Sequence, residues 1–483
     1  MSADPSVSGP RMTLVSVETE VMSPEPKLPS ANPEDEADLP DSDSSVAATS
    51  AEFDPVLEAI NLDALKSIVL DTRLKRDGQP LLGISEKTNI LTCFIEEKPL
   101  FGSYNVLFVV TFSDHVKWIA RFPGYGVSSF GELEARRLLS DIQTKALIRS
   151  STSIPIPEVF AWDLSRDNPV GVPYHLETFI EGRPLAERWT GEWLSDESKK
   201  MKILRKLAKL MSQLHSLHFD KIGSLVLGAD GTSLEVDAIV DMNLSFDMMS
   251  QGELWPTASL SGPFRSTKEY LLSMLYDPEE LPEVQRYFKA EIAILRQAIE
   301  SIPKTLDTPQ SFSLGHPDFN YQNILTDDEG EITGIIDWDG LETCPRALGF
   351  ACYPSWITRD WDPAMYDYAK EMPDPDNKAY QEDSPEQLLS YRREYAAAMA
   401  DQNLPEEAYS PNDTRLSHLV EAISIAVSNT MCRPSILRVL LEYAFDKKMP
   451  FTQNEFHDAW LDHGAEAWLD EIRYAFGRMW HEE

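Results

Sequence analysis

The stretch SFSLGHPDFNYQNILTDDEGEITGIIDWDG, residues 311–340, says most about the fold and chemistry of this chain. It sets His316, Asp318 and Asn323 in the pattern H-x-D-x-x-x-x-N. An acidic, turn-rich segment follows, and then an apolar run leads to Asp337. The pattern predicts a loop and a hairpin that bring these polar side chains together.

These residue types suit phosphoryl transfer, which needs an acid near the attacking hydroxyl and oxygen ligands for Mg²⁺. In this hypothesis Asp318 orients the acceptor hydroxyl and accepts its proton, while Asn323 and Asp337 bind the metal. His316 is expected to pack and hydrogen-bond so that the loop is held. Asp and Asn in loops also form simple turns, but the second apolar run ending in Asp337 favours a hairpin beside a metal site.

The same residues resemble the aminoglycoside phosphotransferase family, the small-molecule branch of the protein-kinase-like fold. HPDFNYQNIL is similar to the family's catalytic loop, and GIIDWDG is similar to its metal-binding segment. The resemblance implies an α+β, two-lobed fold with a small antiparallel sheet in the first lobe and a mainly helical second lobe. It also implies ATP as donor, Asp318 as catalytic base, and Asn323 and Asp337 as magnesium ligands. Asp339 is interpreted as secondary.

A chain of 483 residues exceeds what one hydrophobic core usually serves. We expect a disordered, acidic, Ser/Pro-rich tail over 1–52, a kinase-like first lobe over 53–180 and a helical second lobe over 181–483. The second lobe would carry the catalytic loop at 315–339 and a helical insertion at about 360–414.

Acids outnumber bases 80 to 43, which gives a formal charge of −37. This charge repels nucleic acid and anionic membrane surfaces. It can attract a cationic acceptor, although acidity more often serves solubility. The four cysteines are too scattered for a disulfide framework, no apolar run reaches the length of a spanning helix, and the N-terminus lacks a signal-peptide pattern. A cytoplasmic protein without membrane or nucleic-acid partners is therefore expected.

Apolar spacing predicts a short helix pair near 53–69, then strands at 90–95, 106–112 and 116–122. A longer helix is predicted over 131–149, where good helix formers carry an apolar face.

The nucleotide site is expected on these elements. The turn PLFGSYN holds Gly102 and Ser103, whose backbone N–H groups would approach the phosphates. Arg121 in VKWIARFP stands where kinase-like folds carry a lysine, and the resemblance implies that it steadies the phosphates. A helix glutamate would pair with it, Glu134 by preference and Glu132 as the alternative.

The I-P-x-P element in TSIPIPEVFAWD also resembles the family. By this resemblance the next strand ends at a hinge, and adenine would bind backbone atoms near Thr178 to Ile180.

Further helices are predicted near 197–216, 284–299 and 416–445, with a last helix carrying Trp460, Trp468, Tyr474 and Trp480 as packing anchors. His215 and His218 are interpreted as structural. The acids of 360–414 either line a pocket for a cationic acceptor or face water, and the second interpretation is favoured because charged runs normally do so.

The leading hypothesis is an ATP- and Mg²⁺-dependent kinase acting on a hydroxyl of a small molecule. A protein kinase is the first alternative, but no A-P-E segment follows Asp337, and Pro317 stands where H-R-D has its arginine. A catalytically silent nucleotide-binding module is the second. The sequence specifies neither the acceptor nor the oligomeric state, because one scaffold hosts many functions.

Overall fold

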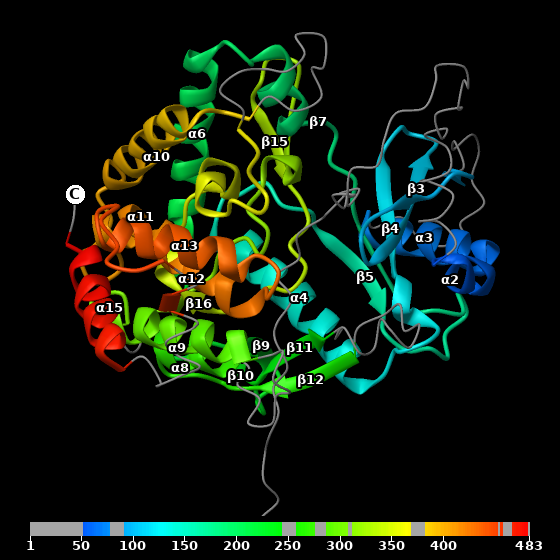
Figure 1. Ribbon diagram of the computed structural model, residues 1–483. Coiled ribbons are helices and arrows are strands. Elements are labelled where there is room, and N and C mark those ends of the chain that lie inside the picture. Colours follow the sequence, from blue (N-terminus) through cyan, green and yellow to red (C-terminus); the bar gives the residue numbers. More distant parts are fainter. Residues whose placement is uncertain are drawn as a thin grey trace, which may run out of the picture.

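The computed structural model describes residues 52–77, 91–243, 257–275, 286–307, 312–368, 382–452, 455–456 and 466–481. These residues form a smaller lobe built on an antiparallel sheet and a larger lobe built mainly of helices (Figure 1). The architecture is α+β and two-lobed. Of the tail expected over 1–52, only Glu52 lies within the described residues.

The small lobe is organised around one sheet with strand order β1-β3-β4-β6-β5, in which β2 also pairs with β3 and every pairing is antiparallel. The strands are β1 (Cys93–Ile95), β2 (Leu100–Phe101), β3 (Asn105–Phe112), β4 (Lys117–Pro123), β5 (Val159–Asp163) and β6 (Tyr174–Thr178). Branched and aromatic side chains dominate β3 and β4, and most of both strands is buried. The predicted strands are therefore present, the first starting later than expected.

Three helices pack beside this sheet: α2 (Asp54–Ala59), α3 (Leu62–Arg76) and α4 (Glu132–Ser151). The Asn61 side chain caps α3 by accepting from the N–H of Ala64 at 3.1 Å. Val56, Leu65 and Val69 from the helix pair join the sheet's buried aromatic residues in one core. The sequence periodicity predicted this helix pair and α4 correctly.

Two segments of the small lobe reach the large one. The first is the I-P-x-P element between α4 and β5, whose Ile154 and Ile156 are buried in the core of the large lobe. The Pro155 carbonyl accepts from the N–H of Ile335 at 2.8 Å, so the element is hydrogen-bonded to the hairpin that leads to Asp337. The second is the segment after β6.

The large lobe consists of helices and four small sheets. Its helices are α5 (Leu185–Glu187), α6 (Glu197–Met211), α8 (Thr267–Met274), α9 (Arg286–Ser301), α10 (Pro385–Ala400), α11 (Pro411–Arg415), α12 (Ser417–Ser428), α13 (Arg433–Ala444) and α15 (Glu466–Met479). Two three-stranded sheets are formed by β7 (Arg183–Pro184), β14 (Ile324–Thr326) and β15 (Ile332–Ile335), and by β8 (His218–Phe219), β13 (Phe312–Ser313) and β16 (Cys344–Pro345). Two hairpins pair β9 (Ser224–Leu227) with β10 (Leu234–Asp237) and β11 (Ile239–Asn243) with β12 (Thr257–Ser261).

Two apolar cores fill the large lobe. One joins α6 and α10 to the catalytic hairpin, and the other joins α8, α9, α12, α13 and α15. The last helix departs from its prediction in one respect, because Tyr474 is 71% exposed and its ring contacts the Arg478 guanidinium rather than the core. Trp480 is buried and Trp468 packs against the second core, while Trp460 lies outside the described residues.

Candidate active site

The loop between β13 and β14 is held in place by His316, which is 4% exposed. Its Nδ1 accepts from the N–H of Asp318 at 3.1 Å, so the ring proton is on Nε2, which donates to the Ile336 carbonyl at 2.8 Å. Burial lowers the pKa of His316 to about 4, and the ring therefore stays neutral at pH 7. These are the contacts expected of a residue that holds the loop.

Asp318 sits in a largely enclosed position with two amide partners. Its Oδ2 accepts from Asn323 Nδ2 at 2.9 Å and from Gln322 Nε2 at 3.3 Å. Burial raises its pKa to about 6, the Asn323 hydrogen bond opposes that rise, and the nearby Asp337 charge adds to it. Asp318 is thus ionised at pH 7 but close enough to neutrality to take up a proton.

Asn323 and Asp337 stand at the two ends of the β14–β15 hairpin. The Ile336 N–H donates to the Asn323 carbonyl at 2.9 Å, which keeps the hairpin ends together. Within the described part of the chain, both hydrogen bonds of the Asn323 side chain start from Nδ2 and reach Asp318, so Oδ1 is left as a potential metal ligand. The Asp337 side chain is 44% exposed.

Asp337 has a left-handed backbone, with φ of 63°. Aspartate tolerates this region better than most residues, but the conformation persists only where neighbours fix it. His316 holds the carbonyl of Ile336 just before Asp337, and Trp338 Nε1 donates to the Ile335 carbonyl at 2.8 Å just behind it. The strain turns the carboxylate out of the hairpin toward the small lobe's strand β4.

Arg121 of β4 meets both acids of this segment. Its Nη2 lies 2.8 Å from Asp337 Oδ1 and 2.6 Å from Asp339 Oδ2. Asn105 Nδ2 also donates to Asp339 at 3.2 Å. Asp339, interpreted from the sequence as secondary, is therefore a direct and largely enclosed partner of the strand arginine.

Arg121 and its acidic neighbours stabilise one another's charged forms. Burial disfavours the charged form of Arg121, but Asp339, Asp337 and Glu177 together raise its pKa. Burial likewise raises the pKa of Asp339, and Arg121 and Lys145 outweigh it, so the net pKa is lowered. The Arg121 Nε–H is buried and has no hydrogen-bond partner among the described residues.

The predicted pair between Arg121 and Glu134 is not formed. Glu134 instead accepts from the N–H of Gly131 at 2.8 Å and caps the start of α4. The carboxylate that approaches Arg121 from the small lobe is Glu177 of β6, at 3.8 Å from Nη1. One sequence signal points to Glu177, because it is an acidic residue inside the mostly apolar strand YHLETFI.

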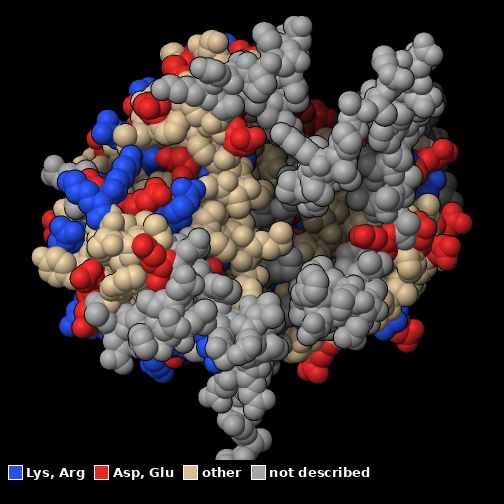
Figure 2. Space-filling view, viewed as in Figure 1, with Lys and Arg blue, Asp and Glu red and all other residues tan. Residues whose placement is uncertain are grey.

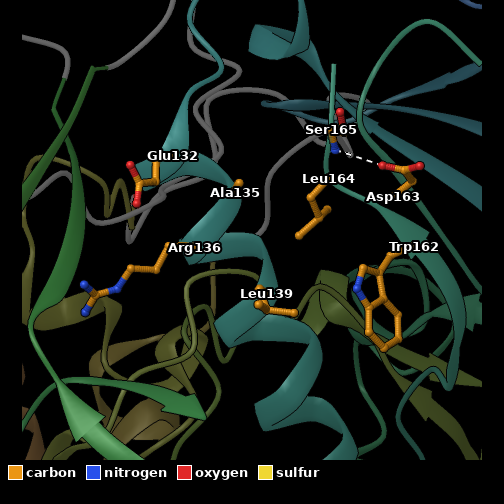
Figure 3. A pocket seen from close by; sticks show the side chains of 8 residues that line it. All are labelled: Glu132, Ala135, Arg136, Leu139, Trp162, Asp163, Leu164 and Ser165. Carbon is orange, nitrogen blue, oxygen red and sulfur yellow. Dashed lines mark hydrogen bonds between the residues drawn. The ribbon is translucent and has the colours of Figure 1, made fainter. Parts of the chain in front are cut away.

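Glu132, the alternative partner, also lies away from Arg121. It lines an open cavity of about 450 Å³ between α4 and β5, together with Arg136, Leu139 and Trp162 (Figure 3). Neither Asp318 nor Asp337 lines this cavity, so it is separate from the candidate active site.

The turn before β3 is tight: Gly102 N–H donates to the Asn105 carbonyl at 2.9 Å. Gly102 and Ser103 are exposed there, and the adjoining Asn105 bonds to Asp339, so the turn stands over the metal-binding segment. At the predicted hinge, the N–H groups of Thr178 and Phe179 already donate to carbonyls of the small-lobe sheet, at 2.9 and 3.3 Å. Ile180 N–H makes no hydrogen bond within the described residues.

Five acids of 360–414 are held in ion pairs, which favours the interpretation that they do not line a pocket for a cationic acceptor. The pairs are Asp360 with Arg392, Asp383 with Lys200, Glu382 with Arg359, Glu394 with Arg205 and Asp413 with Arg346. Residues 369–381 lie outside the described residues. In Figure 2 acidic and basic side chains are intermingled over the helical lobe.

A comparison with protein-family models gives a match over residues 103–382, more than half of the chain, to the phosphotransferase enzyme family. The chain belongs to this family. The matched segment includes the turn at Ser103, Arg121, the catalytic loop and Asp337. The predicted resemblance and the protein-kinase-like α+β fold are both confirmed.

Relatives of this family member occur in fungi. A subtelomeric hrmA-associated cluster protein of Aspergillus fumigatus is 26% identical over 313 residues, which cover 54% of this chain and 60% of that protein. Altered inheritance of mitochondria protein 9, mitochondrial, of Saccharomyces cerevisiae is 23% identical over 345 residues, 60% of this chain and 54% of that protein. The chain therefore spans about half the length of the curated relatives it matches.

Solved structures are less similar to this chain in sequence. Aminoglycoside phosphotransferase APH(4)-Ia has a TM-score of 0.38 and 14% identity, covering 87% of this chain and 99% of that one. Macrolide 2'-phosphotransferase type I has a TM-score of 0.35 and 11% identity, covering 85% and 98%.

The expected cytoplasmic location is wrong by these comparisons, because several of the matched yeast relatives are named as mitochondrial proteins. The expectation rested on the scattered cysteines, the absence of an apolar run long enough to span a membrane and the lack of a signal-peptide pattern, none of which reports how the relatives are targeted. Within the described residues, no helix is both long and apolar enough to span a membrane.

Proposed function

We propose that this family member transfers the γ-phosphate of ATP to a hydroxyl group of a small molecule, with Asp318 as catalytic base. One observation carries the proposal. The carboxylate of Asp318 is held by Asn323, whose remaining oxygen lies on the same hairpin as Asp337, and Asp337 is in turn held by Arg121. This brings a base, two oxygen ligands and a cation to one place, the set that phosphoryl transfer requires.

Asp318 accepts the proton of the acceptor hydroxyl. The hydroxyl oxygen forms its bond to the γ-phosphorus, the bond from that phosphorus to the β–γ bridging oxygen breaks, and ADP leaves with the bond's electrons. The pKa of about 6 suits this role, because Asp318 is ionised at pH 7 yet basic enough to share the proton. His316 keeps the loop fixed without touching the reacting groups.

The residues present fit Mg²⁺. Among the described residues no cluster of three or more His, Cys, Asp and Glu can hold a metal ion. Mg²⁺ is commonly bound through one or two protein oxygens and the phosphates of its nucleotide rather than by an all-protein cage. Asn323 Oδ1 and the half-exposed Asp337 would hold it, and the ion would neutralise charge on the transferred phosphate.

Arg121 and the turn at Gly102 are the proposed phosphate contacts. The unpartnered Nε–H of Arg121 shows that the guanidinium has donor capacity beyond its two acids. In this proposal adenine binds at the hinge through Ile180, because the N–H groups of Thr178 and Phe179 are already used.

A small-molecule acceptor is favoured over a protein because the match is to a family of phosphotransferase enzymes and the chain lacks the A-P-E segment of protein kinases. The ion-paired acids of α10 and its neighbourhood give no support for a cationic acceptor in particular. The acceptor is therefore best sought among hydroxyl metabolites without regard to charge.

The test is thermal stability with and without MgATP, for the unaltered chain, Asp337→Ala and Asp328→Ala. Asp328 lies on the same hairpin, but its side chain is 94% exposed, so it is the matched control. At one hundred times the dissociation constant a ligand stabilises by about 2.7 kcal/mol. We expect a Mg²⁺-dependent shift that Asp337→Ala abolishes and Asp328→Ala retains. No shift at saturating MgATP in the unaltered chain would overturn the proposal.

A further inference from the structure

Five charged side chains from four elements meet between the lobes: Arg121, Lys145, Glu177, Asp337 and Asp339, here called the interlobe charge cluster. Arg121, Lys145 and Glu177 are each less than a tenth exposed. Unpaired burial of such groups is strongly unfavourable, so their mutual arrangement must be specific.

Lys145 is the unexpected member. It lies on α4, where kinase-like folds carry an acid toward the strand cation, and its side chain is 3% exposed. Its Nζ is 3.3 Å from Glu177 Oε2 and 4.0 Å from Asp339 Oδ1. One buried ammonium group thus approaches two of the three acids that lie beside Arg121.

Glu177 is the centre of the small-lobe side. Besides Lys145, it approaches Arg121 Nη1 at 3.8 Å and His175 Nε2 at 3.5 Å. Both cations of the interlobe charge cluster therefore share one carboxylate.

The five members of the interlobe charge cluster include one more acid than base, and the most exposed of them is Asp337, at 44%. Two cations face three acids when Asp337 is included, and two acids when Asp337 is engaged by Mg²⁺. With MgATP present, Arg121 and Lys145 would balance Glu177 and Asp339, and the Arg121 N–H that holds Asp337 at 2.8 Å becomes available to a phosphate oxygen.

We propose that Lys145 and Glu177 are positioning residues that hold Arg121 and Asp339 in the geometry that receives the nucleotide phosphates, the part that the sequence assigned to Glu134. This rests on the proposed function. The usual arrangement, with the cation on the strand and the acid on the helix, is here extended: the helix supplies a second cation, and the neighbouring strand supplies the acid.

The test compares Glu177→Gln, Lys145→Met and the control Glu134→Gln in the full chain, titrated by calorimetry with adenosine, ADP and ATP in the presence of Mg²⁺. Loss of one charged partner should weaken MgADP and MgATP binding by about 10- to 100-fold. Adenosine binding should be unchanged in all three variants. Glu134→Gln should bind all three ligands as the unaltered chain does.

Two outcomes would overturn the proposal: unchanged MgATP affinity in Glu177→Gln and Lys145→Met, or loss of affinity in Glu134→Gln with none in Glu177→Gln. A uniform loss for adenosine and ATP would mean a structural defect and would also refute a positioning role. If a single variant fails to fold, the charge-balanced pair Lys145→Met with Glu177→Gln replaces it, judged by the same ATP-to-adenosine ratio. Failure of the proposed function is separate, because the unaltered chain would then bind no MgATP.

Discussion

Replacing Gln322 by alanine should move the acid limb of the rate profile to higher pH. Asp318 must be ionised to accept a proton, and the pKa of its carboxyl is raised to about 6. Activity should therefore be lost as the pH falls through 6. At pH 5 about one-tenth of Asp318 is ionised and at pH 7 about nine-tenths, so kcat/KM should differ by roughly tenfold.

The expected rise in the pKa of Asp318 in Gln322→Ala follows from the geometry of the hydrogen bond that the substitution removes. Gln322 Nε2 donates to Asp318 Oδ2 at 3.3 Å, a long hydrogen bond that favours the ionised form. A hydrogen bond to a charged group contributes about 1.5–3 kcal/mol at good geometry. Taking about half of that for this distance gives about 0.75–1.5 kcal/mol, or about 0.5–1 pH unit.

The measurement is kcat/KM for ADP formation between pH 5 and 8, with an acceptor found by screening hydroxyl metabolites. The unaltered chain should show a limb near pH 6, and Gln322→Ala should show it at higher pH with the same plateau. A profile flat from pH 5 to 7 in the unaltered chain, or a limb displaced to lower pH in the variant, would refute the assignment of Asp318 as base.

Three further predictions concern turnover and stability. Asp318→Asn should lower turnover by about 10²- to 10⁴-fold while Asp328→Asn leaves it intact; equal turnover would refute the role of the base. Glu291, 4% exposed on α9, has a pKa raised to about 7 by burial. Its contribution to folding stability is therefore present below its unfolded pKa of about 4.3 and is lost as the pH rises through 7. Glu291→Gln should raise the free energy of unfolding by about 2–3 kcal/mol at pH 8 and little at pH 4, and an equal gain at both pH values in urea unfolding would contradict this. A Cβ on Gly315 would lie 2.5 Å from the Gly349 backbone, so Gly315→Ala should destabilise the protein by about 1–3 kcal/mol. A Cβ on Gly477, inside α15, has no atom within 4 Å, so Gly477→Ala should stabilise the protein by about 0.5–1 kcal/mol. A lower denaturant midpoint for Gly477→Ala than for Gly315→Ala would contradict the packing.

The catalytic loop could be located from sequence because its polar residues lie within one short stretch. Asp318, Asn323 and Asp337 are separated by a hairpin whose apolar strands and turn are recognisable locally. Local hydrogen bonds, such as that between Ile336 and Asn323, then bring the side chains together.

The partner of Arg121 could not be found in this way. Glu134 and Lys145 are both buried on α4, but eleven residues of helix separate them by about 16 Å. Periodicity identifies the buried face without showing which turn of it reaches the strand cation. Glu134 caps the start of its own helix, and Glu177 approaches Arg121 only because β6 pairs with β4 in the folded sheet.

The I-P-x-P element and the segment after β6 both contact β15. Pro155 accepts from the N–H of Ile335, and the Ile180 side chain packs on Gly334, so closely that a Cβ there would lie 2.5 Å from Ile180 Cγ2. If the small lobe rotates relative to the large one about these two contacts, the rotation axis passes close to β15. Points near the axis travel least, so Asp337, two residues beyond Ile335, should keep its place while the parts of the small lobe farther from β15 move more.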